Sequence, residues 1–178
     1  GVLLSANTNL ALMDENGSLT IPENVTAIGE GAFADLSGLK TIIIPGTVEE
    51  IRTNAFKNNA DLENVIIRNG LKTIGTEAFR DCSNIKSVEL PESIETIEVL
   101  AFYGCSSLQS IKIPSKVEKI NDYTFSHCRS LSKVELPEGI IYLVNYDTDE
   151  VIYSAGYKHT DSNMYYKLSV TKDLTVNE

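Results

Sequence analysis

Three cysteines are the residues of this chain best suited to metal or redox chemistry, because thiolates bind zinc and paired thiols form disulfides. They are Cys82, Cys105 and Cys128, each 23 residues from the next. Structural zinc sites favour pairs of ligands separated by only about two to four residues, which this spacing does not provide. We therefore expect three buried, free thiols at one repeated inward position, with a metal site or a disulfide as the alternative.

The remaining polar groups form no recognisable catalytic site. Ser126 precedes His127, but no acidic residue stands at a spacing typical of a catalytic triad, so we expect His127 to be a surface residue. The segment from Asp147 to Glu150 resembles part of a calcium-binding loop. It lacks the glycine and the distal glutamate of such a loop, so we expect a hairpin turn there. The sequence thus predicts no enzyme activity, no metal site and no cofactor.

One glycine-containing segment fits a loose nucleotide-binding pattern. Gly29 to Ala34 reads G-x-G-x-x-A. In nucleotide-binding proteins this pattern follows a strand and opens the helix of a βαβ unit. Here the surroundings predict a repeat turn instead, so we expect no nucleotide site.

The composition excludes several classes of partner. The chain has 25 Asp and Glu against 15 Lys and Arg, for a net charge of −10, which disfavours binding to nucleic acid. No apolar run approaches the roughly 18 residues of a membrane span, and no signal peptide is recognisable. The chain starts at Gly1 rather than methionine, so we expect any export signal or anchor to lie outside it.

A repeat of 23 residues organises most of the chain. All five phenylalanines share this spacing, and so do two columns of aliphatic residues. A unit of this length cannot bury its own apolar side chains, so neighbouring units must stack and share a core. The period therefore predicts a solenoid. The three columns are Phe33, Phe56, Phe79, Phe102 and Phe125; Ile28, Ile51, Ile74, Ile97 and Ile120; and Ile42, Val65, Val88, Ile111 and Val134.

Each repeat unit contains three short segments. Leu39 to Pro45 alternates inward and outward positions, which predicts a strand that ends at the proline because proline lacks an N–H. Val48 to Ile51 predicts a second extended or turn segment, and Thr53 to Asn58 predicts about one helical turn that places Phe56 inward. Equivalent strands would lie parallel in successive coils, and the phenylalanines would form one buried stack.

The repeat resembles the BspA-like class of leucine-rich repeats, as Ile85 to Cys105 shows most completely. The resemblance covers about Leu19 to Ile140. It implies a repeat solenoid, namely a right-handed leucine-rich-repeat superhelix with a parallel β-sheet face and short helical or turn segments, of the α/β horseshoe type. It also implies a bacterial surface or secreted protein without catalytic residues. The departures from the pattern are Leu36 and Asn59 in place of cysteine, Thr124 in place of alanine and Arg68 in place of proline.

The two ends of the chain depart from the repeat. Residues 1–18 are expected to form an N-terminal cap, and residues 19–140 comprise five leucine-rich repeats and a partial sixth. Residues 141–178 contain six of the eight tyrosines and are expected to form either a β C-terminal cap or the start of a following module.

We expect the outward face of the predicted sheet to be the binding surface of a non-catalytic adhesion or protein-binding module, outside the cell or at its surface. Ile43 and Ile66 would form an apolar contact patch, although β propensity on a tolerant surface also explains them. The expected partner is a host matrix or neighbouring-cell surface protein, with a glycan as the alternative. A structural spacer that displays another domain is the alternative function. The candidate binding residues are Thr41, Ile43, Asn64, Ile66, Ser87, Glu89, Ser110, Lys112, Lys133 and Glu135.

Overall fold

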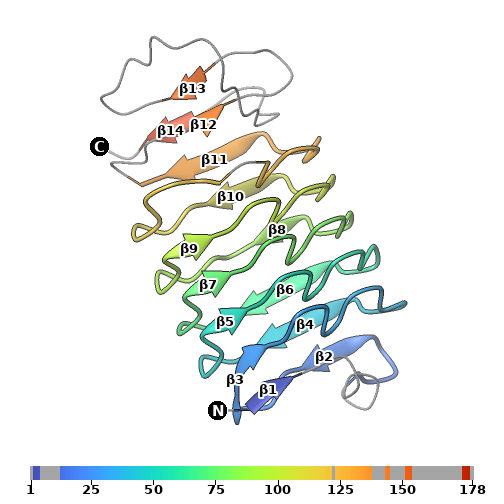
Figure 1. The fold of residues 1–178 in the computed structure, drawn as a ribbon. Helices are drawn as coiled ribbons and strands as arrows, with labels where there is room; N and C mark the ends of the chain where they lie inside the picture. Colours follow the sequence, from blue (N-terminus) through green and yellow to red (C-terminus); the bar gives the residue numbers. More distant parts are fainter. Residues whose placement is uncertain are drawn as a thin grey trace.

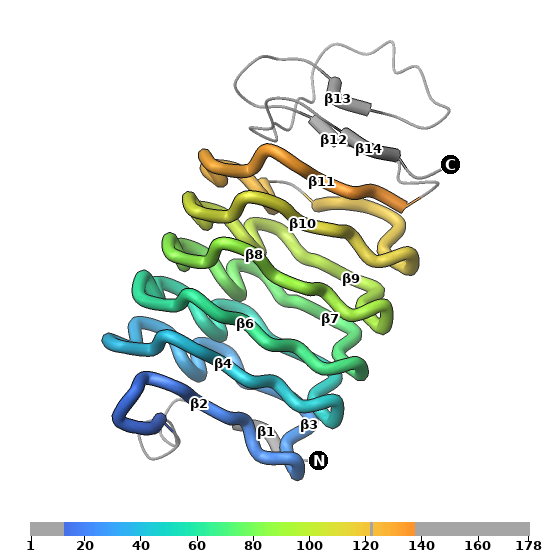
Figure 2. The backbone as a smooth tube through the Cα atoms, turned by 180° about the vertical axis from the view of Figure 1, so that it is seen from behind, coloured from blue at the N-terminus to red at the C-terminus, as the bar shows by residue number. Residues whose placement is uncertain are grey.

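The chain coils into a solenoid of parallel strands (Figure 1), as expected from the repeat. This computed structural model describes residues 2–4, 13–121, 123–137, 143–144, 151–153 and 174–176. Four successive coils between residues 18 and 97 each contribute one strand to each of two facing sheets, which Figure 2 shows from behind. The part of the chain described contains strands and turns but no helix.

The larger of these sheets, here called the main sheet, has seven strands, and its register equals the repeat length. Ser18 pairs with Thr41, and Thr41 pairs with Asn64, so each strand lies one repeat from its neighbour. Further along the sheet, Ser110 pairs with both Ser87 and Lys133. The order of the sheet is β2 (Ser18–Thr20), β4 (Thr41–Ile44), β6 (Asn64–Ile67), β8 (Ser87–Val88), β10 (Ser110–Lys112), β11 (Lys133–Leu136) and β14 (Leu174–Val176).

A second parallel sheet of five strands lies where the sequence predicted only a short extended or turn segment. Its register is also one repeat, since Ile51 pairs with Ile28 on one side and with Ile74 on the other. The order is β1 (Val2–Leu4), β3 (Val25–Ile28), β5 (Glu50–Ile51), β7 (Thr73–Ile74) and β9 (Thr96–Ile97). A separate antiparallel pair consists of β12 (Leu143–Val144) and β13 (Val151–Tyr153).

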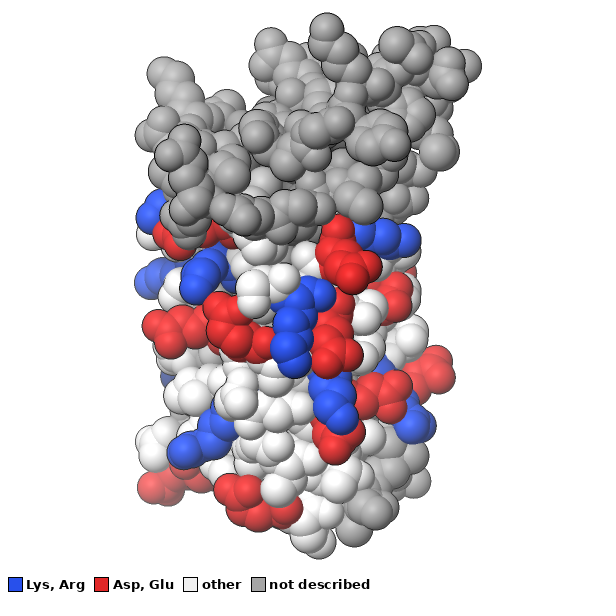
Figure 3. Space-filling view, turned by 90° about the vertical axis from the view of Figure 1, so that its left-hand side faces the viewer, with Lys and Arg blue, Asp and Glu red and all other residues white. Residues whose placement is uncertain are grey.

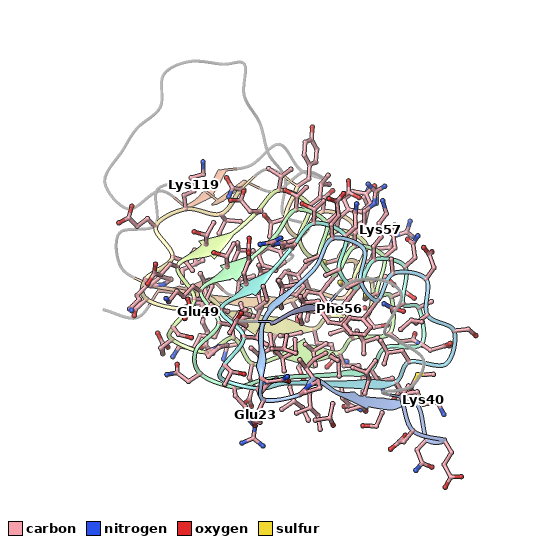
Figure 4. All side chains as sticks on the ribbon, turned by 60° about the horizontal axis from the view of Figure 1, so that its bottom comes forward. Glu23, Lys40, Glu49, Phe56, Lys57 and Lys119 are labelled. Atoms are coloured by element: carbon pink, nitrogen blue, oxygen red, sulfur yellow. The ribbon has the colours of Figure 1, made fainter. Side chains whose placement is uncertain are left out.

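The core between the sheets contains the predicted phenylalanine stack. All five rings are almost completely buried, with neighbouring ring centroids 5.1 to 5.7 Å apart and planes within 10° of parallel. Figure 4 shows Phe56 inside the coil, whereas Lys57 beside it points outward. Burial of an aromatic ring and contact with its neighbours both favour this arrangement. The inward position of the phenylalanine column is therefore confirmed.

The segment that carries each phenylalanine is not helical, so this prediction was wrong. Asn54 and Asn58 have φ angles of 58° and 61°, whereas a right-handed helix needs negative φ throughout. In this turn only alternate N–H groups donate to carbonyls of their own coil, as that of Lys57 does to Asn54. The N–H of Phe56 instead donates to the carbonyl of Ala78 in the next coil, at 2.8 Å. The turn therefore binds the neighbouring coil, as a β-strand does.

Left-handed backbone recurs at the same two positions of every coil. The first position lies two residues before the phenylalanine and the second lies two residues after it. Glycine and asparagine adopt this conformation readily, whereas bulky side chains are disfavoured in it. The two columns are Gly31, Asn54, Glu77, Leu100 and Tyr123, and Asp35, Asn58, Asp81, Gly104 and His127.

Arg68, the one departure from the proline column, changes the local hydrogen bonding. In four other coils, the residue three positions after the proline donates its N–H back to the proline carbonyl, at 3.0 to 3.1 Å. Arg68 has an N–H, and this donates to the carbonyl of Ile44 at 2.9 Å. The N–H of Gly70 then donates to Ser93 Oγ at 2.9 Å. Gly70 has a φ of 139° and packs directly on the backbone of Gly46, a contact that no side chain would fit.

The cysteines occupy the inward position predicted for them. All three are free and buried, and each thiol donates to the carbonyl of the phenylalanine one coil earlier, at 3.1 to 3.3 Å. Asn59 fills the same position and donates to the carbonyl of Phe33 at 2.7 Å. Burial raises the pKa of the Cys82 and Cys128 thiols to about 12, and raises the pKa of Cys105 well above its ordinary value. Asparagine and cysteine are thus interchangeable here, because both donate to an inward carbonyl.

We predict that Phe79→Ala lowers the free energy of unfolding by roughly 3–5 kcal/mol, because it opens a cavity in the middle of the stack. Phe79→Leu, which keeps much of the volume, should lower it by less. Both values come from the midpoint and slope of urea unfolding curves. A loss below about 1 kcal/mol for Phe79→Ala would contradict a buried ring.

The three thiols should react slowly in the native protein, because burial holds them in the neutral form and keeps reagents away. A thiol-specific reagent at neutral pH should label all three cysteines promptly after denaturation, without prior reduction. Rapid labelling of the native chain would show that the column is accessible. Fewer than three reactive thiols after denaturation would show that a disulfide exists.

Candidate binding surface

The outward face of the main sheet has the register that the sequence predicted. In β6, Val65 is 7% exposed whereas Ile66 beside it is 47% exposed. Alternate residues of a strand point to opposite faces, so Ile66 and its cross-strand partner Ile43 share the outer surface. Ile43 is half-buried. The expected apolar pair is therefore present at the surface, next to the middle of the sheet.

The structure places nine of the ten candidate residues in strands on this face, and Glu89 directly follows Val88, the last residue of β8. Strand pairing aligns them in two columns, with neighbouring strands about 4.8 Å apart. The exposed members are Asn64, Ile66, Ser87, Glu89, Lys112 and Lys133, and the half-buried members are Thr41, Ile43, Ser110 and Glu135. Whether these residues bind a partner remains a prediction.

The apolar pair has a polar, uncharged border on one side. Asn64 Nδ2 donates to Thr41 Oγ1 at 3.3 Å, which links neighbouring strands across the surface. Ser87 and Ser110 continue the same column along the sheet. Hydroxyl and amide groups at this border offer both donors and acceptors to a partner.

The charged residues on this face form ion pairs within a strand or with the proline turns. Glu135 forms an ion pair with Lys133 of its own strand at 2.6 Å, and this hydrogen bond lowers the pKa of the Glu135 carboxyl, with a smaller contribution from the charge of Lys112. Lys112 Nζ binds Glu92 Oε1 at 3.1 Å rather than a glutamate of the sheet. A continuous ladder through Glu89, Lys112 and Glu135 is therefore not formed by direct ion pairs.

The edge formed by the proline turns carries a separate series of ion pairs. Glu49 pairs with Lys72 at 2.8 Å, and Glu95 pairs with Lys116 at 3.7 Å. Figure 3 shows this edge, where blue and red side chains follow one another and the middle of the lower half is largely white. These side chains are exposed, so the pairs add little to stability. The edge presents balanced charge rather than a strongly charged patch.

The opposite edge, formed by the phenylalanine turns, carries a network that the sequence did not reveal. Lys57 Nζ and Arg80 Nη1 both bind Glu77, at 2.6 and 3.0 Å. The hydrogen bond from Lys57 is the largest cause of the lowered pKa of Glu77. Arg80 also lies over the ring of Tyr103, and His127 contacts that ring. His127 is exposed, as expected.

Two further features of the structure bear on other classes of function. Among the described residues, no group of three or more His, Cys, Asp or Glu side chains is arranged to hold a metal ion. The described segments also contain no helix long and apolar enough to cross a bilayer. The candidate calcium-loop fragment at Asp147 to Glu150 lies outside the described residues.

The fold resembles several solved bacterial proteins. A leucine-rich cell surface protein from Faecalibacterium prausnitzii is 33% identical with a TM-score of 0.66, and the match covers 70% of this chain and 33% of that protein. A leucine-rich repeat protein from T. pallidum is 25% identical with a TM-score of 0.70, covering 74% and 64%. One from Bacteroides ovatus is 27% identical with a TM-score of 0.60, covering 74% and 40%. This chain therefore matches less than two thirds of the length of each of these proteins.

The family assignment follows from sequence and fold together. Among curated proteins, no significant match is found. The model of the BspA type leucine-rich repeat region matches residues 13–132, with six copies of the repeat. This match covers more than half of the chain, and the parallel solenoid agrees with it. The chain therefore belongs to the BspA-type leucine-rich repeat family.

Proposed function

We propose that this chain is a non-catalytic module that binds a protein partner through the outward face of its main sheet. The observation that carries the proposal is the 47% exposure of Ile66 in the middle of a regular strand, beside Ile43. A side chain this exposed contributes little to the core, so burial does not explain an isoleucine at this position. Leucine-rich repeat domains are typically non-catalytic and generally bind proteins, which agrees with this role.

The arrangement of the face fits a protein partner. Protein interfaces usually combine an apolar centre with a polar rim, and here Ile43 and Ile66 adjoin Thr41, Asn64 and the serine column. The six strands from β2 to β11 span about 24 Å at the usual strand spacing. A face about 24 Å long and at most four residues wide is smaller than a standard interface, which buries about 800 Å² on each partner, so a partner would also contact the adjoining turns.

The comparisons support a location at the bacterial cell surface. The relative from Faecalibacterium prausnitzii is described as a cell surface protein, and its match to this chain is 33% identical. That match covers only 33% of the relative, which is therefore much longer than the matched region. We extend the same location to this chain, with binding of a surface protein of the host or of a neighbouring cell as its role. A spacer function would leave the sheet face without a ligand.

A binding screen with matched variants tests this proposal. The purified chain is passed over immobilised fibrinogen, fibronectin, laminin and collagen. For a matrix protein that binds, Ile66→Asp should weaken affinity by more than about 1 kcal/mol, because a charge replaces the apolar centre. Lys112→Ala should chiefly change the association rate and its salt dependence. Affinity is measured by surface plasmon resonance, beside the thermal midpoint of each variant.

Thr96→Asp is the control, because it introduces the same charge on β9 of the second sheet. It should leave binding unchanged. If Ile66→Asp binds normally and Thr96→Asp loses binding, the interface lies on the second sheet instead. Absence of binding to all four matrix proteins would favour the spacer function.

A further inference from the structure

The edge formed by the proline turns contains a chemically reactive pair of residues, Asn69 followed by Gly70. Asparagine before glycine loses ammonia spontaneously in water, because glycine has no side chain to keep its nitrogen away from the asparagine amide. Asn69 is exposed and Gly70 is half-buried, so water reaches the pair. The equivalent residues of the other coils form no such pair, and they are Glu23 and Asn24, Gly46 and Thr47, Glu92 and Ser93, and Ser115 and Lys116.

The fold requires the glycine of this pair. Gly70 has a φ of 139°, and a Cβ at this position would overlap the carbonyl oxygen of Gly46 in the preceding coil. In the same contact, a Cβ on Gly46 would lie only 2.5 Å from the carbonyl oxygen of Asn69. The main chains of two coils therefore touch at the reactive pair. A side chain at Gly70, which would slow the reaction, is excluded by this contact.

A hydroxyl group of the next coil holds the N–H of Gly70. This N–H donates to Ser93 Oγ at 2.9 Å, and the hydroxyl of Ser93 donates in turn to the carbonyl of Leu71 at 2.7 Å. The second bond uses the hydroxyl proton, so the oxygen faces Gly70 as an acceptor. The nitrogen of Gly70 must leave this acceptor before it can approach the side chain of Asn69. The hydrogen bond to Ser93 therefore opposes the reaction.

We propose that Asn69 is a site of spontaneous deamidation and that Ser93 controls its rate. In the reaction the nitrogen of Gly70 loses its proton to water and attacks Asn69 Cγ. The bond from Cγ to Nδ2 then breaks, and ammonia leaves after taking up a proton, so that a five-membered cyclic imide remains. Water opens this imide at Cγ to give aspartate, or at the backbone carbonyl to give isoaspartate. Water is the only co-reactant, and the site is independent of the protein-binding face proposed above.

Either product changes the contact between the two coils. Both products carry a new carboxylate directly after Arg68, whose N–H donates to the carbonyl of Ile44 at 2.9 Å. Isoaspartate also lengthens the main chain by one carbon atom at the point where it touches Gly46. The close packing there leaves no space for an added atom. The isoaspartate form should therefore unfold at a lower temperature than the aspartate form.

The test follows the reaction by peptide mass spectrometry. The full chain is incubated at neutral pH, and samples are digested with a glutamate-specific protease at mildly acidic pH, where deamidation is slow. Cleavage after Glu63 and Glu77 releases residues 64–77, a peptide that is identical in all variants of Ser93. The Asn69→Asp variant supplies the aspartate product as a standard, from which the isoaspartate product separates by chromatography.

Two variants of Ser93 show whether its hydroxyl controls the rate. Ser93→Ala should accelerate deamidation at least about twofold, because one hydrogen bond of this kind changes an equilibrium by a factor of roughly 2 to 10. Ser93→Thr keeps the hydroxyl and should react slowly, since threonine already occupies the equivalent position at Thr47. Asn16 before Gly17 is the internal control, because the N–H of Gly17 donates to a carbonyl of its own turn. Its rate should be equal in all three chains.

The chain unfolded in guanidinium chloride gives the rate without protection by the fold, and it should deamidate at Asn69 faster than the native chain. The proposal fails on any of three results. The first is an equal rate at Asn69 in the native and unfolded chains, and the second is an equal rate in the native chain and in Ser93→Ala. The third is equal acceleration at Asn16 and Asn69 in Ser93→Ala, which would show a general loosening of the fold instead of the loss of one hydrogen bond.

Discussion

Every coil of this protein lies on the next with a register of one repeat, and three sets of backbone hydrogen bonds impose that register. Two of the sets are the parallel ladders of the sheets, and the third joins the phenylalanine turns. In the third set, Phe33 donates to Ala55 at 2.7 Å and Phe56 donates to Ala78 at 2.8 Å. A coil with one residue more or fewer would break at least one of these ladders. The repeat length is therefore constant because each buried backbone N–H and carbonyl needs a hydrogen-bond partner in the next coil.

This constraint divides the residues of each coil into two classes. An inward residue meets the same neighbours in every coil, so the same side chain recurs, as phenylalanine and cysteine do. An outward residue meets solvent and is free to vary from coil to coil. The proposed protein-binding surface accordingly uses outward residues of the main sheet, with Ile66 as its most exposed apolar member.

The same division explains how far the sequence could predict the structure. The phenylalanine stack, the cysteine position and the outward face of Ile66 were predicted correctly, because each depends on a period that the chain repeats. The turn around Asn54 was predicted as helical. Glycine and asparagine indicate left-handed backbone in a sequence, but the equivalent positions of later coils hold glutamate, leucine and tyrosine, which do not. The contact of Arg80 with Tyr103 was missed, since it joins outward residues of different coils that share no repeated type.

Hydrogen exchange of individual backbone amides tests most directly whether the coils are locked to one another. The amides of Phe56 and Phe79 donate to the next coil, whereas those of Lys57 and Arg80 donate within their own turn. The account predicts that the two phenylalanine amides exchange only when the whole solenoid unfolds, with equal free energies, and that the other two exchange faster. Exchange of the phenylalanine amides as fast as those of Lys57 and Arg80 would contradict it.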